Sequence, residues 1–457
     1  MSESKDHLGI VIVGHVDAGK STTTGRLLFE LNGIKERELE KLKEEAKAVG
    51  KESFFFAFVM DQDKTEREKG VTIKCTTKEF FTPSHHYTII DAPGHRDFVK
   101  NMVTGSSQAD VALLMVPANK GGFETAIAKG NHKKNEIQGQ TRQHARLLNL
   151  IGVDQLIVGV NKMDDSSCDY SEERFEEIKK YMLEMLKKIG FKTERIPVIP
   201  ISGWKGDNIK TPSEKMPWYK GFEVKFKKET VKGHTLLDAL DKVARVPKRK
   251  PDAEVRIPLS GIFPIKGKGY VVTGRVEQGT LKPEMEVKFV PSGATGKVGT
   301  IEMHHKQVQA AVHGDNVGVN IKGLTKDNMP KVGDILVPKT STLGQVEEFT
   351  ASVSVQEHPG KLKVGFSPLC MVRTSKSSAR MVKINWKSNA KTTAGEKMED
   401  PEYLETGDIA EVVMRPAQPI AMEKYDECKP LARVSMMDSN QLIMLGKVTD
   451  VKYKQDK

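Results

Sequence analysis

Eight residues near the start of the chain have the types and spacing of a phosphate-binding loop. The run Gly14–Ser21 (GHVDAGKS) fits the pattern G-x-x-x-x-G-K-[ST] and follows a continuous apolar run over 8–13, which predicts a buried strand. In such a loop, backbone N–H groups surround phosphate, the lysine contacts the terminal phosphates and the hydroxyl ligates Mg²⁺. The pattern does not specify the base. The expected phosphate-binding residues are Gly14, His15, Val16, Asp17, Ala18, Gly19, Lys20, Ser21 and Thr22, with Ser21 also on the metal.

A second string, Asn161–Asp164 (NKMD), has the chemistry to select guanine. The Asp164 carboxylate can accept hydrogen bonds from the N1–H and the 2-amino group of guanine, and adenine offers no such pair of donors. Asn161 would bond the acceptor edge of the base, and the stem of Lys162 would cover the ring. The loop Ser202–Trp204, after the next predicted strand, would supply an amide for the guanine carbonyl. The expected base-binding residues are Asn161, Lys162, Met163, Asp164, Ser202, Gly203 and Trp204.

A third string, DAPGH, begins at Asp91, where another predicted strand ends. Asp91 would hold Mg²⁺ through a water molecule, and the amide of Gly94 would bond the γ-phosphate and lose that bond on hydrolysis. His95 stands where many GTPases place a water-orienting glutamine, so it is the candidate catalytic residue. An isolated loop histidine is more commonly bonded to backbone, but the residues before His95 favour catalysis. Together the three strings predict a GTP-binding switch protein.

The elements that must position these strings show two different hydrophobic patterns along the chain. Residues 1–245 alternate apolar strands (87–91, 111–116, 155–161, 197–201) with amphipathic helices (35–49, 171–189), which predicts an α/β domain with a mostly parallel sheet. The proline-rich stretch 246–253 is a predicted linker. Residues 254–340 and 341–457 show short alternating runs, typical of two all-β barrels. The expected fold is an α/β P-loop GTPase domain followed by two all-β barrel domains.

Composition adds limits of its own. The 457 residues carry a net charge of +11, and 241–250 is especially basic, which indicates a polyanion near the joint after the first domain. A merely solvated basic surface explains the charge equally well. The four cysteines are far apart without metal-ligand spacing, as in a reducing compartment. With no apolar run long enough to span a membrane and no secretory signal, we expect a cytoplasmic protein without membrane partners.

Beyond these strings, longer stretches match one family. They are GHVDAGKSTTTGRL, EREKGVTI, DAPGHRDFVKNMVTG, NKMD, PISGWKGDN, EMHH, GDNVG and HPG, and they span the chain almost end to end. On these stretches the sequence resembles the translation elongation factor 1-alpha family. Residues 370–380 lack the family's histidines, and Met437 and Asn440 stand where it usually has arginines. These departures favour its divergent branch, the elongation factor-like proteins.

The resemblance implies a GTP-dependent factor that delivers aminoacyl-tRNA to the ribosomal A site and hydrolyses GTP on codon recognition. The cofactors would be GTP or GDP and Mg²⁺, a guanine nucleotide exchange factor would replace GDP, and the protein would act as a monomer. The residue roles carried over are Thr72 as the second hydroxyl on Mg²⁺, Val16 and Val71 as an apolar gate before His95, and Glu302, His304 and Asn316 as the pocket for the aminoacyl end.

Two alternatives remain at this stage. A GTPase of the same fold that partners a release or ribosome-rescue factor would bind protein rather than aminoacyl-tRNA. A nucleotide-regulated cytoskeletal scaffold, with actin as its partner, is compatible with the basic surface as a second role. A P-loop kinase that uses ATP is disfavoured by Asn161 and Asp164.

Overall fold

The computed structural model forms two compact units, Met1–Pro247 and Lys248–Lys457. The boundary between the units falls inside the predicted linker 246–253. The structure describes residues 5–31, 34, 36–48, 50, 55–60, 76–91, 106, 109–128, 139–227, 229–248, 250–267, 269–303, 306–356, 358, 360–389, 395–438 and 441–455.

The first unit is built on a mixed sheet with strand order β2-β3-β1-β4-β5-β6 among its described residues. Strands β1, β3, β4, β5 and β6 run parallel, and β2 pairs antiparallel with β3 at the edge. From its second residue onward β1 is buried throughout, because helices cover both faces of the sheet. The strands are β1 Asp6–Gly14, β2 Thr76–Phe81, β3 His85–Asp91, β4 Val111–Pro117, β5 Gln155–Asn161 and β6 Val198–Pro200.

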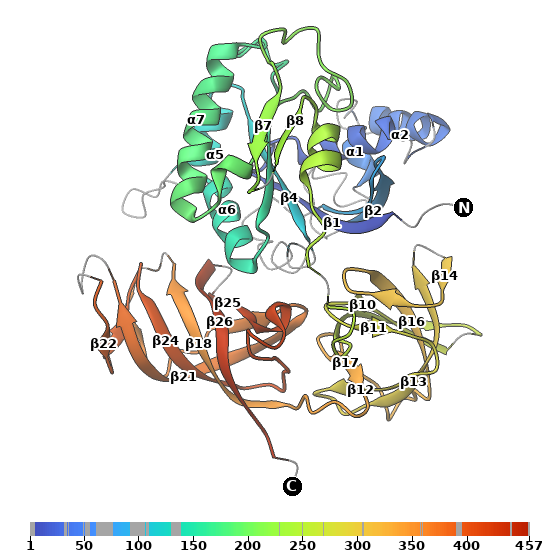
Figure 1. Cartoon of the computed structure of the whole chain (residues 1–457), viewed down its shortest axis with the longest axis vertical. Coiled ribbons are helices and arrows are strands. Elements are labelled where there is room, and N and C mark those ends of the chain that lie inside the picture. Colours follow the sequence, from blue (N-terminus) through green and yellow to red (C-terminus); the bar gives the residue numbers. More distant parts are fainter. Residues whose placement is uncertain are drawn as a thin grey trace. The chain divides into compact units, whose positions relative to one another are not determined.

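Helices flank this sheet, with α5, α6 and α7 gathered on one side in Figure 1 and α1 and α2 on the other. A hairpin of β7 and β8 and a π-helical turn complete the described part of the unit. The helices are α1 Lys20–Glu30, α2 Glu36–Ala48, α5 Gly122–Ile127, α6 Gln140–Ile151, α7 Glu172–Ile189 and α8 Leu236–Asp238. The shorter elements are η2 Ala57–Val59, η5 Thr193–Arg195, β7 Phe222–Lys225, β8 Thr230–Gly233 and η6 Ala239–Val243.

Helix α7 has clear end signals in its sequence. Ser171 is the N-cap, and its hydroxyl accepts a hydrogen bond from the amide of Arg174 at 3.2 Å. Acidic residues occupy the first turn and lysines the last, which suits the helix dipole. Gly190 ends the helix in the left-handed conformation at φ 110°. The predicted helix 171–189 is therefore confirmed to within a residue.

The connection between α5 and α6 leaves and returns at one place. The amide of Gly139, just before α6, donates to the carbonyl of Ala128, just after α5, at 2.8 Å. A Cβ at Gly139 would lie 2.3 Å from the carbonyl oxygen of Ala126, so the two helix ends touch backbone to backbone. Ala128 and Gly139 thus form a closed neck for the intervening residues.

The second unit holds the two predicted barrels, drawn in yellow-green to yellow and in orange to red in Figure 1. In its first part, β12, β17, β9, β10, β16 and β13 form an antiparallel ring that the β12–β13 pairing closes, with β14 appended. The core inside this ring is aliphatic and contains Phe289. The strands are β9 Ile257–Ile265, β10 Gly269–Arg275, β11 Thr280–Leu281, β12 Glu286–Val290, β13 Thr295–Met303, β14 Lys306–Val308, β15 Ala311–Val312, β16 Asn316–Lys322 and β17 Ile335–Pro338.

The second ring follows the same plan. Strands β20, β25, β26, β18, β24 and β21 are antiparallel neighbours, and the β20–β21 pairing closes them around a core with many methionines. Both barrels are therefore confirmed. The elements are β18 Val346–Val355, β19 Leu362–Lys363, β20 Leu369–Val372, β21 Ser375–Ser388, β22 Met398–Glu399, β23 Tyr403–Leu404, β24 Ile409–Pro416, η7 Lys429–Ala432, β25 Arg433–Asp438 and β26 Gln441–Tyr453.

Buried ion pairs join the two barrels. Arg256, from the first barrel, donates to Glu423 of the second through Nη2 at 2.8 Å, and both side chains are 7% exposed. Arg373 of the second barrel donates to Glu277 of the first at 2.9 Å. Charges this buried are tolerated when each has a partner, so the contact is specific in its geometry.

Candidate nucleotide site

The phosphate loop is a tight turn between β1 and α1. The turn covers His15–Gly19 within the predicted loop, and the amide of Ala18 donates to the carbonyl of His15 at 3.2 Å. Gly19 has a φ of 83°, and a Cβ there would lie 2.3 Å from Nδ2 of Asn161. The turn therefore needs glycine at this position. Its amides lead directly into the N-terminus of α1, the arrangement that binds anions.

Lys20, the first residue of α1, reaches back over the loop. Its Nζ donates to the carbonyl of His15 at 2.9 Å, and the residue is 8% exposed. The ammonium group is thus held at the loop rather than extended into solvent. Burial lowers the pKa of His15, and the Lys20 charge lowers it further. The neutral imidazole leaves Lys20 as the positive charge beside the loop.

Asn161 joins the phosphate loop to the loop after β6. Its Nδ2 donates to the carbonyl of Ala18 at 2.9 Å, and its Oδ1 accepts from the amide of Gly203 at 2.8 Å. The side chain is 3% exposed. The expected contact of Asn161 with the base edge stays a prediction, and the structure adds a second role for this side chain. The side chain links the two loops, and its Oδ1 occupies the Gly203 amide, which was a candidate donor to the guanine carbonyl.

The base-recognition string alternates between buried and accessible side chains. Met163 is fully buried, and its amide and carbonyl bond to Ile201 and Tyr170 at 3.3 and 2.8 Å. Lys162, with a φ of 64°, and Asp164 flank it and are half-buried. Met163 therefore anchors the loop, while its two neighbours remain available to a ligand.

Helix α6 contributes two residues that were not predicted. Oε1 of Gln140 accepts from the amide of Val16 at 3.2 Å, which fixes a phosphate-loop peptide. His144, one turn further on, is 1% exposed. Burial lowers the pKa of His144 to about 3, with the charge of Lys20 acting in the same direction. The detectable signal was polar residues four apart on the buried face of an amphipathic helix.

Three family models match successive parts of the chain. The family model for the elongation factor Tu GTP binding domain matches residues 5–246. The elongation factor Tu domain 2 matches 269–337, and the GTP-eEF1A C-terminal domain-like family matches 348–449.

Curated relatives match the whole chain. Elongation factor 1-alpha of Eremothecium gossypii is 42% identical over 458 residues, which cover 100% of this chain and 97% of the relative. The chain belongs to the elongation factor 1-alpha family. Its homologue from Hyperthermus butylicus is 43% identical over 99% of this chain and 98% of the relative, and the oocyte form from Xenopus laevis is 42% identical over 99% and 96%. This member of the elongation factor 1-alpha family is a GTP-dependent translation elongation factor and a translational GTPase.

Solved structures show the same fold at lower identity. The Ski7 GTPase-like domain of S. cerevisiae, bound to GTP, is 18% identical, covers 98% of both chains and has a TM-score of 0.75. The elongation factor SelB of Methanococcus maripaludis is 20% identical over 99% of this chain and 80% of that one, with a TM-score of 0.66. The family assignment rests on the full-length relatives, and with it comes guanine nucleotide binding by the first unit.

Other predicted site residues of this elongation factor have more limited descriptions. The backbone of Asp91 ends β3 and pairs with Ile12 of β1, so it reaches the edge where the phosphate loop begins. The residues Val71, Thr72, Gly94 and His95 lie outside the described part of the chain.

The predicted aminoacyl-end residues lie on adjacent strands of the first barrel. Glu302, on β13, pairs with Gly318 of β16, and Asn316 begins β16 two positions away. Both are half-buried, while Ile301 and Val317 beside them are buried, so Glu302 and Asn316 share the outer face of the sheet. The third predicted residue, His304, lies outside the described residues. Within the described chain, no helix is long and apolar enough to cross a bilayer.

Proposed function

We propose that this elongation factor carries aminoacyl-tRNA to the ribosomal A site in its GTP state and releases it after hydrolysis. The observation that carries the proposal is the 42% identity to elongation factor 1-alpha over the whole chain, barrels included. A GTPase alone would need only the first unit. In this proposal an exchange factor replaces GDP, and the protein acts as a monomer in the cytoplasm.

The proposed nucleotide contacts come from the phosphate loop and from the string Asn161–Asp164. The phosphate-loop amides and Lys20 hold the phosphates, and Asp164 accepts from the N1–H and 2-amino groups of guanine. Asn161 has a second amide hydrogen beyond the one given to Ala18, and this donor is its proposed contact with the base. Lys162 covers the ring.

The donor set also fits Mg²⁺. Ser21 lies in the first turn of α1, and the β1–β3 register brings the backbone of Asp91 beside β1, two residues before the loop. Hydroxyl and carboxylate oxygens are the ligands that Mg²⁺ prefers, and the ion usually keeps several waters. When bound, the ion would neutralise charge on the β- and γ-phosphates. Ser21 and Thr72 would ligate it directly and Asp91 through water.

The proposed catalytic group is His95, which orients the attacking water. Val16 and Val71 would keep its imidazole away from that water until the ribosome triggers hydrolysis. The tether from Gln140 to the Val16 amide supports a fixed position for one side of this gate.

The test is protection of aminoacyl-tRNA from spontaneous deacylation, measured with GTP and with GDP. We expect protection with GTP and little with GDP. Glu302→Gln should weaken protection, because a charged acceptor for the flexible tRNA end becomes neutral. Glu286→Gln is the matched control, since Glu286 lies in the same barrel and pairs with Lys339 on the surface. Equal deacylation with and without protein, in either nucleotide, would overturn the proposal in favour of a release-factor partner or a scaffold.

A further inference from the structure

The loop that follows the base-recognition string is held together by its own side chains. The carboxylate of Asp165 accepts from the amide of Ser167 at 2.9 Å and from its hydroxyl at 2.6 Å. The thiol of Cys168 donates to the carbonyl of Lys162 at 3.1 Å. The Ser167 hydrogen bonds lower the pKa of Asp165, so its carboxylate stays charged. These hydrogen bonds therefore hold the chain in a compact turn immediately after Asp164.

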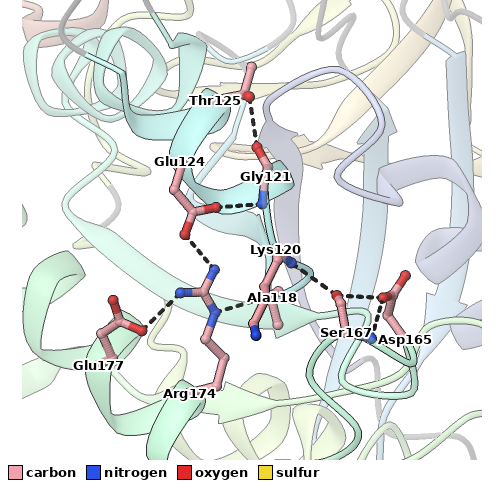
Figure 2. A network of polar contacts seen from close by, with 9 residues as sticks. All are labelled: Ala118, Lys120, Gly121, Glu124, Thr125, Asp165, Ser167, Arg174 and Glu177. Atoms are coloured by element: carbon pink, nitrogen blue, oxygen red, sulfur yellow. Dashed lines mark hydrogen bonds and ion pairs between the residues drawn. The ribbon is translucent and has the colours of Figure 1, made fainter.

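This loop is also bonded to a segment more than forty residues earlier in the chain. The hydroxyl of Ser167, while donating to Asp165, accepts from the amide of Lys120 at 3.0 Å (Figure 2). Lys120 lies in the short connection between β4 and α5. One hydroxyl thus uses both its donor and its acceptor capacity to join two segments.

Arg174, on α7, fixes that connection from the other side. Its guanidinium donates to the carbonyl of Ala118 at 2.9 Å, to Glu124 at 2.7 Å and to Glu177 at 2.8 Å, as Figure 2 shows. It also lies 5.3 Å from the ring centre of Phe123. The side chain is 12% exposed. A planar fork with several donors meets these partners in fixed directions, which a lysine ammonium group does not reproduce.

The network reaches both ends of the base-recognition string. The amide of Ala118, whose carbonyl binds Arg174, donates to the carbonyl of Asn161 at 2.8 Å. At the other end, Ser167 and Asp165 close the loop after Asp164. Glu124 is tied in turn to the start of α5, since its second oxygen accepts from the amide of Gly121 at 2.7 Å. The string between Asn161 and Asp164 is therefore supported before and after its ligand-facing residues.

We propose that Arg174 and Ser167 are positioning residues for guanine recognition: they hold the Asp164 loop against the β4–α5 connection and so set how well the site distinguishes guanine from related bases. The inference rests on the proposed contact between Asp164 and the base. Neither residue needs to touch the nucleotide. Their effect is on the direction of the Asp164 carboxylate, and the 2-amino group of guanine is the part of the base that reports it.

The experiment compares the dissociation constants of GDP and IDP, since hypoxanthine lacks the 2-amino group. The variants are Arg174→Lys and Ser167→Ala in the full chain. The matched control is Lys179→Ala, because Lys179 lies on the same helix in an exposed ion pair with Glu176. A well-placed hydrogen bond to the 2-amino group gives GDP an advantage of about fivefold or more over IDP. We expect Arg174→Lys and Ser167→Ala each to lose most of this advantage and the control to keep it.

The ratio separates positioning from general loosening. A variant that only destabilises the domain weakens GDP and IDP binding alike, and its melting temperature falls while the ratio stays. That result in both variants overturns the inference. If the wild-type protein binds GDP and IDP equally, the proposed contact of Asp164 fails first and the inference fails with it. If the wild-type protein prefers GDP and both variants keep the preference, only the positioning role of Arg174 and Ser167 is refuted.

Discussion

Replacing Asn161 by alanine tests whether the two loops of the nucleotide site depend on one side chain. The change removes the donor to Ala18 and the acceptor for Gly203, which are bonded at 2.9 and 2.8 Å. Each buried peptide group left without its partner costs about 1–3 kcal/mol. Because the side chain is 3% exposed, water does not readily replace it. The expected total is about 2–6 kcal/mol.

This cost can appear in either of two measurements. If the loops of the Asn161→Ala variant stay together without nucleotide, the free energy of unfolding falls. If they separate and must be brought together by the ligand, the affinity for GDP falls instead, by about thirtyfold for the lower limit of 2 kcal/mol. Denaturant unfolding and calorimetric titration of GDP, both on the nucleotide-free protein, therefore belong together.

Two further variants sharpen this test. Asn161→Asp keeps an acceptor for Gly203 but faces the Ala18 carbonyl with a carboxylate oxygen, so we expect no recovery relative to alanine. Asn149→Ala is the control, since this half-buried residue near the end of α6 has, among the described residues, no side-chain hydrogen bond to the two loops, and the expected change is within about 0.5 kcal/mol. The reasoning is refuted if the losses of Asn161→Ala in stability and in binding together stay below about 1 kcal/mol.

Three other predictions concern separate parts of the molecule. Asp164→Asn should shift preference from GTP to XTP, because one acceptor becomes a donor; titration of both nucleotides checks this, and unchanged GTP affinity contradicts the assignment. His144 has a pKa of about 3 when folded and an ordinary value of 6.5 when unfolded. A proton is therefore taken up on unfolding, so lowering the pH from 7.5 to 5.5 should cost about 1.4 kcal/mol of stability through this group, and the loss in His144→Gln should be smaller by that amount. Glu423→Ala should lower the free energy of unfolding by about 3 kcal/mol, measured in denaturant, because Arg256 keeps its bond to Glu254 but loses its buried partner; a loss no larger than that of an exposed pair would contradict this.

The elements near the site were predictable because their signals are local. The strand 155–161 was predicted with the bounds that β5 has, since a continuous apolar run ends at a polar string. The glycine pattern of the phosphate loop and the cap of α7 are likewise contained in short windows of sequence. The short alternating runs of 254–340 and 341–457 predicted the two barrels, and the family resemblance added the role in translation; the comparisons confirm both.

The partners within the site were less predictable because they come from far along the chain. Gln140 bonds a residue 124 positions earlier, and Arg174 bonds one 56 positions earlier. Nothing in the string NKMD indicates that the side-chain amide of Asn161 hydrogen-bonds to two other loops. Such contacts depend on how the parallel strands bring their carboxyl ends together, and that arrangement exists only in the folded sheet.

The closed neck formed by Ala128 and Gly139 has a consequence for changes in chain length. Its 2.8 Å bond fixes the entry and the exit of the connection independently of what lies between them. Once the ends of a loop are held, doubling its length costs only about 0.6 kcal/mol in closure entropy. We therefore expect an epitope or a small reporter domain inserted between Ala128 and Gly139 to leave α6 with little strain. The same neck would let related chains differ in the length of this connection by many residues, while the hydrogen bond from the Val16 amide to Gln140 stays the same.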